Sequence, residues 1–275
     1  MVTISLVSHG HGVMIIELIK SLLKINEVEN IIVTLNIPEE INLPKSRKIK
    51  LIKSLLKINE VENIIVTFNI PEDISLPKSP KIKIIDNIKP VGFGQNHNNA
   101  FKLSKSNFFC VLNPDITILD NPFILLIKEL TTHNASLIAP LIVGPKGLPE
   151  DSVRNFPLIS TLLKKLIFSS KGNIILDDIS TPYSPDWVAG MFMLFKKDSY
   201  QKVNGFDEGF FLYYEDVDLC ARLWSKNLKI IVTNKVTVIH DAQRASRSNF
   251  TYFGWHLLSI IRYFFKHWGR LPKHE

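Results

Sequence analysis

The segment from Gly205 to Leu223 gathers the residue types that acid–base chemistry on a bulky polar substrate requires. It holds five carboxylates and five aromatic residues: Asp207, Glu208, Glu215, Asp216, Asp218, Phe206, Phe210, Phe211, Tyr213 and Tyr214. Apolar residues recur at helical spacing from Val217 onward, so three of the acids fall at the start of a helix. A carboxylate there can act as a general base inside an aromatic pocket. Acids in a first helical turn can also simply complement the helix dipole.

Two more polar groups stand where strands are expected to end. The apolar run 108–112 predicts a buried strand, and Asn113-Pro114-Asp115 follows it. Open α/β sheets bind ligands at the carboxyl ends of their strands, so Asp115 can hold a divalent cation against a diphosphate. His240 ends a second predicted strand and can complete the metal shell. The alternatives are an ordinary turn and a structural histidine.

The elements that must position these groups alternate between strand and helix. Strands are expected at residues 2–8, 30–35, 81–86, 137–143, 229–233 and 236–240, and helices at 13–25, 100–104 and 121–130. A βαβ start of this type places a ligand loop after its first strand, where His9 and His11 lie.

A glycine- and asparagine-rich stretch, 87–100, is expected to be a loop that can cradle a nucleotide. Its Gly92-Phe93-Gly94 begins like a dinucleotide fingerprint, but His97 stands where the third glycine is needed. A plain polar loop is the alternative. Farther along, residues 187–195 are apolar around Gly190, which suits a buried strand or a sugar face stacked on Trp187.

These segments together resemble the inverting glycosyltransferases of family 2, and in particular their rhamnosyltransferase-like branch. The resemblance covers residues 1 to about 250. It rests on Phe206-Asp207-Glu208, Tyr214-Glu215-Asp216-Val217-Asp218-Leu219, Asn113-Pro114-Asp115 as a form of the family's Asp-x-Asp element, Ser152-Val153-Arg154-Asn155-Phe156-Pro157, and the segment that begins at His240. Asn113 departs from that pattern and leaves Asp115 as the only carboxylate of its element.

The resemblance implies an α/β fold of GT-A type, with a mixed, mostly parallel sheet flanked by helices. It implies inverting transfer from a dTDP- or UDP-linked sugar to a lipid-linked or oligosaccharide acceptor, with a divalent metal (Mg or Mn), in surface polysaccharide or O-antigen synthesis. The implied residues are Asp216 as catalytic base with Glu215 beside it; Ser8, His9, Asn69, Gly92, Gly94, Asn98, Asn113 and Arg154 for the donor; Trp187, Gly190 and Tyr214 for the acceptor; and Asp115 and His240 for the metal.

A tandem duplication lies inside the predicted domain, which spans residues 1–249. Residues 18–52 and 51–85 align at an offset of 33 (51 − 18) and differ at only five of 35 positions. Two copies are too few for a solenoid, so one copy is expected to add an edge element or to sit on the surface. The sequence leaves open which copy occupies the original strand position.

Composition limits the partners and the compartment. A net charge of +7 and a pI near 9.2 favour sugar nucleotides, acidic lipid surfaces or nucleic acid. The resemblance selects the first two and no nucleic acid. Cys110 and Cys220 form neither a disulfide framework nor a metal spacing, and no export signal precedes the first strand. We therefore expect a cytoplasmic protein, peripheral on the inner face of the plasma membrane.

The tail, residues 250–275, begins with a helix-length amphipathic segment, 250–268. Its polar residues recur every three or four positions: His256, Ser259, Arg262 and Lys266. We expect this helix to lie in a membrane interface with its basic groups toward anionic headgroups. The alternative is that it covers an apolar face of the catalytic domain or of a partner.

Two other classes of function stay open at this point. A catalytically weakened nucleotide-sugar-binding protein would bind a donor without transferring the sugar. A nucleotidyltransferase would release pyrophosphate from a nucleoside triphosphate.

Overall fold

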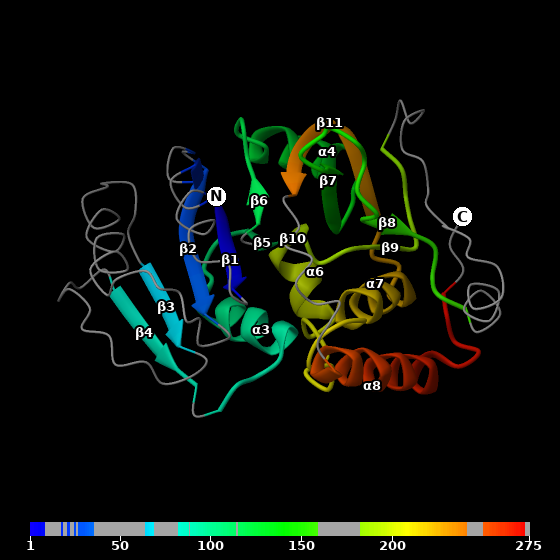
Figure 1. Ribbon diagram of the computed structural model, residues 1–275. Coiled ribbons are helices and arrows are strands. Elements are labelled where there is room, and N and C mark those ends of the chain that lie inside the picture. The colour runs from blue at the N-terminus through cyan, green and yellow to red at the C-terminus, as the bar shows by residue number, and fades with distance from the viewer. Residues whose placement is uncertain are drawn as a thin grey trace.

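A single mixed sheet organises the computed structural model, which describes residues 1–8, 18, 21–22, 25, 27–35, 64–68, 82–87, 89–113, 115–158, 182–240 and 250–272. Nine strands of these residues follow the order β4-β3-β2-β1-β5-β10-β7-β11-β6 (Figure 1). They are β1 (Val2–Ser8), β2 (Val28–Leu35), β3 (Ile64–Phe68), β4 (Ile82–Asp86), β5 (Phe108–Leu112), β6 (Ile116–Thr117), β7 (Leu137–Val143), β10 (Phe192–Lys196) and β11 (Ile230–His240). A separate ladder pairs β8 (Val153–Arg154) with β9 (Trp187–Val188).

The sheet changes direction at its centre. Strands β4, β3, β2, β1 and β5 all pair in parallel, as the βαβ start predicts. β10 is antiparallel to both β5 and β7, whereas β11 runs parallel to β7. The carboxyl end of β5 therefore lies beside the start of β10, and the sheet is mixed and mostly parallel.

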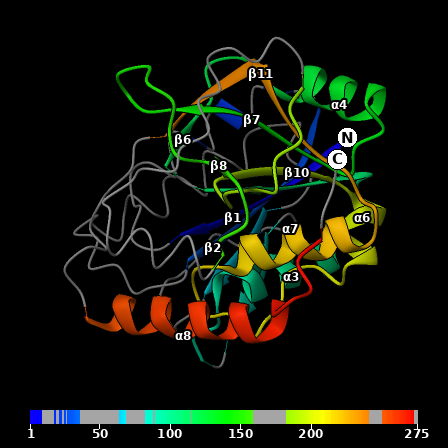
Figure 2. The same cartoon turned by 90° about the vertical axis from the view of Figure 1, so that its right-hand side faces the viewer.

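Helices cover both faces of the sheet, and one more helix lies outside them. They are α3 (Phe93–Leu103), α4 (Phe123–Thr132), α6 (Lys197–Lys202), α7 (Glu215–Ser225) and α8 (Phe250–His267). Figure 2 shows α4 on one side of the sheet, α3 and α7 on the other, and α8 beyond them. None of the described helices combines the length and the hydropathy that crossing a bilayer would require.

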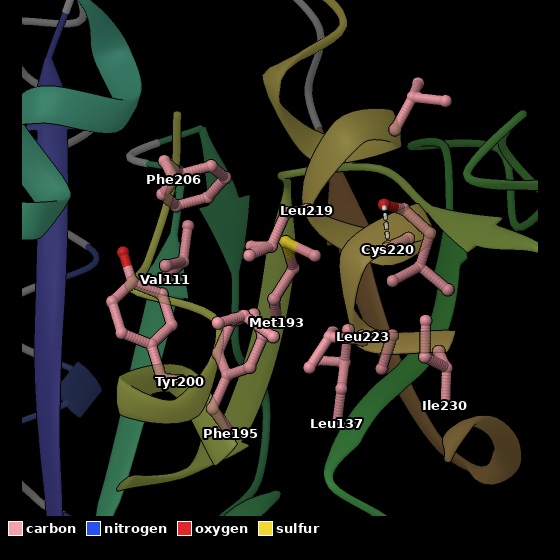
Figure 3. Close-up of a cluster of buried hydrophobic side chains, with 14 of the residues drawn as sticks. Val111, Leu137, Met193, Phe195, Tyr200, Phe206, Leu219, Cys220, Leu223 and Ile230 are labelled. Carbon is pink, nitrogen blue, oxygen red and sulfur yellow. Dashed lines mark hydrogen bonds between the residues drawn. The ribbon is translucent and has the colours of Figure 1, made fainter. Parts of the chain in front are cut away.

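The core is divided between the two faces by the alternation of side chains along the strands. In β5, Cys110 and Leu112 join a cluster with Phe123 of α4, whereas Phe109 and Val111 join a cluster on the opposite face. That second cluster contains Leu219, Cys220 and Leu223 of α7 (Figure 3). Burial of this apolar side of α7 fixes the helix against the sheet and so fixes the acids at its start.

Both copies of the duplication supply a strand inside the sheet. β2 pairs with β1, and β3 pairs with β2 so that equivalent residues of the two copies face each other, from Ile31 with Ile64 to Leu35 with Phe68. β4, which pairs with β3 and ends the sheet, also lies almost wholly in the second copy, so this copy supplies the edge of the sheet, in agreement with the expectation of an edge element. Equal sequences present equal hydrogen-bonding and apolar patterns, which allows them to stack in register.

Two expectations require correction. The stretch 87–100 is not a loop throughout, because α3 already begins at Phe93 and buries Phe93, His97 and Ala100 along one side. The strands expected at 229–233 and 236–240 form one strand, β11, with a register shift between Thr233 and Thr237. The helix at 121–130 and the strand at 137–143 are confirmed. The division of the chain at residue 249 stays a prediction.

Candidate functional site

Two tyrosines with a left-handed backbone conformation precede the helix that carries the predicted base. Tyr213 and Tyr214 have φ values of 71° and 64°, a conformation that bulky residues adopt only at a cost. The ring of His256 in α8 lies 5.1 Å from the Tyr213 ring, and the ring of Tyr263 lies 5.3 Å from that of Tyr214. Packing against α8 thus holds the sharp turn that delivers Glu215 and Asp216 at the start of α7.

Asp216 is held by two backbone donors. Its Oδ2 accepts a hydrogen bond from the Gly190 N–H at 3.0 Å, and its Oδ1 accepts one from the Val217 N–H at 2.8 Å. Burial raises the pKa of Asp216, and these hydrogen bonds and the charge of Arg154 offset the rise only in part. A carboxylate with a raised pKa is a stronger base than an exposed one, which suits proton abstraction from a hydroxyl.

Glu215 stands beside Asp216 and is buried more completely. Burial, and then the neighbouring charge of Asp216, raise the pKa of Glu215 well above its usual value. Two neighbouring carboxyls that interact in this way do not both ionise readily and titrate as a pair. Burial and the charge of Asp216 both oppose ionisation of Glu215.

A short connection joins Asp216 to the end of β5. The Gly190 N–H donates to Asp216, and the carbonyl of the next residue, Met191, accepts a hydrogen bond from the Asn113 N–H at 2.8 Å. A Cβ at Gly190 would come no closer than 3.4 Å to Phe93, so packing alone does not require glycine there. Asn113, at the end of β5, is thus connected to Asp216 through the backbone of Gly190 and Met191.

The predicted metal residues meet at the neighbouring strand ends. The His240 Nε2 lies 3.1 Å from the Asp115 Oδ2, and each of the two residues is only 6% exposed. The pairing of β6 with β11, in which Ile116 faces His240, brings them together across the sheet. The Glu150 Oε2 lies 3.9 Å from the His240 Nδ1. Among the described residues, no group of three acidic, histidine or cysteine residues is arranged to hold a metal ion.

Arg154 lies on the Asp216 side of the site. It pairs with Asp151, and its guanidinium carbon lies 5.8 Å from the centre of the Trp187 ring, its partner across the β8–β9 ladder. The positive charge of Arg154 acts to lower the pKa of both Tyr214 and Asp216. The predicted contact of Arg154 with the donor diphosphate stays a prediction, and the geometry gives this residue a second role beside the base.

Three residues predicted to bind the donor contact the protein itself. The Asn98 amide accepts hydrogen bonds from the Tyr200 hydroxyl and the Phe206 N–H, and donates to the Phe206 carbonyl and to Glu208. These bonds give Asn98 a structural role between α3 and the segment at Phe206, and its contact with the donor stays a prediction. A Cβ at Gly92 would lie 2.7 Å from the Phe211 carbonyl, and one at Gly94 would lie 2.5 Å from Phe206. Both positions require glycine because the start of α3 packs closely against residues 206–211 of the protein itself.

The remaining donor residues were expected at the ends of β1 and β3. Ser8 ends β1, as expected, whereas His9 and Asn69 lie outside the described residues. β3, which precedes Asn69, is separated from β1 by β2. Asn36, the equivalent of Asn69 in the first copy, follows β2 directly and is the nearer of the two in strand order.

Several residues of the site were not predicted from the sequence. Glu150 carries no motif of its own, and only the fold brings it near His240. Tyr213 was predicted only as aromatic lining and Tyr214 as lining and an acceptor contact, and the left-handed conformation of the pair was not predicted. The polar stripe of α8 faces the protein instead of anionic headgroups, because Arg262 and Lys266 both pair with Asp207 and Lys266 also pairs with Asp218. The sequence showed that basic residues recur along this helix, but it did not show which acidic residues pair with them.

Comparison with known proteins agrees with this geometry. Residues 171–245 match the family described as the N-terminal domain of galactosyltransferase. The chain is 33% identical over 183 residues to the rhamnosyltransferase WbbL of Escherichia coli K12, which covers 62% of this chain and 69% of that protein. It is also 33% identical over 134 residues to the N-acetylglucosaminyl-diphospho-decaprenol L-rhamnosyltransferase of Mycobacterium tuberculosis, over 44% of this chain and 43% of that enzyme.

A solved structure supports the fold independently of sequence. The structure of GalNAc-T7 with UDP, GalNAc and Mn²⁺ superimposes with a TM-score of 0.60 over 96% of this chain and 47% of that one, at 13% identity. At so low an identity the likeness concerns the fold alone. With the match to WbbL, it places this chain in the rhamnosyltransferase-like branch of the family 2 glycosyltransferases, with a GT-A fold.

Proposed function

We propose that this protein transfers a sugar, with L-rhamnose as the first to test, from a nucleoside-diphosphate donor to a hydroxyl of a saccharide acceptor. The observation that carries the proposal is the short backbone connection between a base and a strand end. Asp216 accepts from the Gly190 N–H at 3.0 Å, and Met191 accepts from the Asn113 N–H at 2.8 Å. A carboxylate with a raised pKa is thereby held in one unit with the strand end that leads to Asp115.

In this mechanism Asp216 removes the proton from the acceptor hydroxyl as that oxygen attacks the anomeric carbon. The bond between the anomeric carbon and the donor diphosphate breaks, and the nucleoside diphosphate leaves with the bonding electrons. One displacement inverts the anomeric configuration. Asp216 must be ionised to accept the proton, and the hydrogen bonds from the Gly190 and Val217 N–H groups and the charge of Arg154 favour its ionised form.

Asp115 and His240 fit a divalent cation. A buried carboxylate and a buried imidazole lie 3.1 Å apart at the strand ends, and the Glu150 Oε2 lies 3.9 Å from the other nitrogen of the imidazole. A nitrogen ligand suits manganese better than magnesium. Bound there, the cation would neutralise charge on the diphosphate leaving group. Asp115 and His240 would hold it, and Asn113 lies at the end of the same strand, β5, that leads to Asp115.

The acceptor is proposed to lie against Tyr214, Trp187 and Gly190. Tyr214 adjoins Glu215 in sequence, and Gly190 contacts Asp216 directly. By its name the mycobacterial relative transfers rhamnose to a sugar on a diphospho-decaprenol. We propose a lipid-linked saccharide acceptor here as well, in surface polysaccharide or O-antigen synthesis. The protein would then work peripherally at the inner face of the membrane, in contact through residues 250–268.

The test is transfer by the purified protein with a panel of dTDP-, UDP- and GDP-sugars, in the presence of Mn²⁺, to a short-chain polyprenyl diphosphosugar. We expect a single donor to stabilise the protein against heat and to release nucleoside diphosphate with acceptor-dependent turnover. The anomeric configuration of the product, read by NMR, should be opposite to that of the donor.

Two outcomes would contradict the proposal. Donor binding without turnover for every acceptor would favour a sugar-nucleotide-binding protein. Release of pyrophosphate from a nucleoside triphosphate would favour a nucleotidyltransferase.

A further inference from the structure

α8 presents opposite chemistry on its two sides. The side that faces the protein makes polar contacts beside the buried ring of Tyr263: Ser259 donates to the Leu212 carbonyl, Arg262 pairs with Asp207, and His267 contacts Asp218 at 2.8 Å. The outward side is apolar, with the following side chains exposed: Phe253 68%, Leu257 47%, Leu258 66%, Ile261 44%, Phe265 82% and Trp268 69%. An amphipathic helix packed on a protein normally buries its apolar side. In α8 the arrangement is reversed.

The polar groups of α8 fix this orientation. Asp218 is fully buried and meets Lys266 at 2.7 Å and His267 at 2.8 Å, while the side chain of Asp207 accepts from Arg262 at 2.9 Å. Rotation of the helix to hide its apolar side would separate Asp218 from Lys266 and His267 and leave only Arg222, at 2.7 Å, to compensate its buried charge. The apolar side is therefore directed away from the body by contacts that are costly to break.

We propose that the outward face of α8 docks on a phospholipid bilayer and lies along its interface; the inference rests on the lipid-linked acceptor proposed above. Residues 250–272 contain no acidic residue, and Arg262, Lys266 and Arg270 lie on or beside the helix. Arg262 and Lys266 keep 44% and 31% of their side chains exposed even while paired. A face rich in Phe and Leu, with Trp268 and cations at its end, matches the interfacial zone of a membrane with anionic headgroups.

The position of the helix agrees with this partner. In Figures 1 and 2, α8 forms the outermost layer on its side of the molecule, beyond α3 and α7. An 18-residue helix is about 27 Å long. Its inner side contacts Tyr213 and Tyr214 next to the base. Docking through its outer side would therefore keep the catalytic residues near the headgroups, where a lipid-linked sugar begins.

The experiment is co-sedimentation of the full chain with vesicles of phosphatidylethanolamine and phosphatidylglycerol, and with neutral phosphatidylcholine vesicles, without donor or acceptor. The test variant is L258D with F265D. The matched control is I124D, because Ile124 is 59% exposed on α4, on the opposite side of the sheet (Figure 2). We expect the double variant to lose at least tenfold in partition coefficient and the control to bind like the unaltered protein.

Trp268 gives a second measurement on the same samples. Its fluorescence should shift to the blue on addition of vesicles, and W268F should remove that part of the shift. Equal binding by the unaltered protein and the double variant would overturn the inference. So would a concentration-dependent dimer that the double variant dissolves, because the face would then belong to a second copy. Donor binding, followed by thermal shift, reports on the proposed function separately.

Discussion

The two sides of the sheet, divided at β1, differ in how much each residue is constrained by its neighbours. On one side β2, β3 and β4 run parallel, and the chain has accommodated 33 additional residues there as a further strand. On the other side, β10, β7, β11 and β6 bring together residues 115, 190, 216 and 240 through specific hydrogen bonds and ion pairs. A repeated parallel strand needs only a matching neighbour. A site assembled from four segments needs each of them in place.

The strongest test of this comparison is D216N. The amide fills the same space and cannot accept the acceptor proton, so turnover should fall by about 10²–10⁴-fold while donor affinity changes little. Initial rates and donor-induced thermal shifts measure the two effects. D120N, at an exposed acid before α4, is the control and should be fully active. Near-normal turnover in D216N would show that Asp216 is not the base.

The second test, D115A, concerns the strand-end pair. Loss of this carboxylate should weaken Mn²⁺-dependent donor binding by roughly 10–100-fold, in the range seen when metal sites lose supporting groups. Titration of the donor at several Mn²⁺ concentrations measures it. E150Q, 3.9 Å from His240, should have a smaller effect. An unchanged metal dependence in D115A would mean that the cation binds at another position.

The third test addresses how α8 is attached. Burial opposes ionisation of Asp218, but the hydrogen bond from His267 and the charges of Arg222 and Lys266 outweigh it and lower its pKa from 3.8 to about 2. Since the folded pKa is the lower one, this stabilisation is present above about pH 4 and is lost as the pH falls through about 2. D218N should therefore lower the free energy of unfolding at pH 7 by roughly 3 kcal/mol and flatten its dependence on pH in that window.

Urea unfolding at pH 7 and at intervals down to pH 2 measures the effect of D218N. D198N, in the first turn of α6, is the matched control. An unchanged pH dependence in D218N would mean that Asp218 does not hold α8.

A smaller effect is expected from R154Q. Burial is the main cause of the raised pKa of Asp216, and the charge of Arg154 opposes it. Without that charge, the acidic limb of the profile of kcat/KM against pH should move to higher pH. A shift in the opposite direction, or a large loss of donor affinity at constant pH behaviour, would assign Arg154 to the diphosphate instead.

We expect the smallest effect on folding and activity from a deletion, although it removes more residues than any other variant changes. Deletion of residues 51–83 joins Lys50 to Ile84 and recreates the sequence of β4, Ile-Lys-Ile-Ile-Asp. This strand can pair with β2 in the register that β3 uses now. The variant should fold, bind the donor and transfer sugar, because Asn36 stays after β2. Loss of folding would show that the second copy has become essential, and loss of donor binding alone would point to Asn69.

The sequence was most informative where one segment holds both the chemistry and the element that positions it. Asp216 and the start of α7 lie in the same stretch, so both were predicted together. Asp115 and His240 were linked only by resemblance to a family, because their contact depends on the pairing of β6 with β11. The start of α3 was misjudged because glycine and asparagine favour loops, whereas burial of Phe93 and His97 against Phe206 overrides that preference.

The orientation of α8 could not be read from its periodicity. The spacing shows that Arg262 and Lys266 lie on the same side of the helix. It does not show whether that side faces solvent, lipid headgroups or acidic residues of the protein. The choice depends on Asp207 and Asp218, which lie more than forty residues earlier in the chain. Long-range partners of this kind are a property of the fold rather than of the segment.

The in-register pairing of β2 with β3 has a consequence for how this chain reaches its folded state. Residues 28–34 and 61–67 are identical, so during folding either copy can compete for the place beside β1. Within these strands only the final residue, Leu35 in β2 and Phe68 in β3, differs between the copies, so the choice depends mainly on the lengths of the connecting segments and on the strand that follows. A duplication that costs the finished sheet little thus adds a nearly degenerate alternative to its folding landscape.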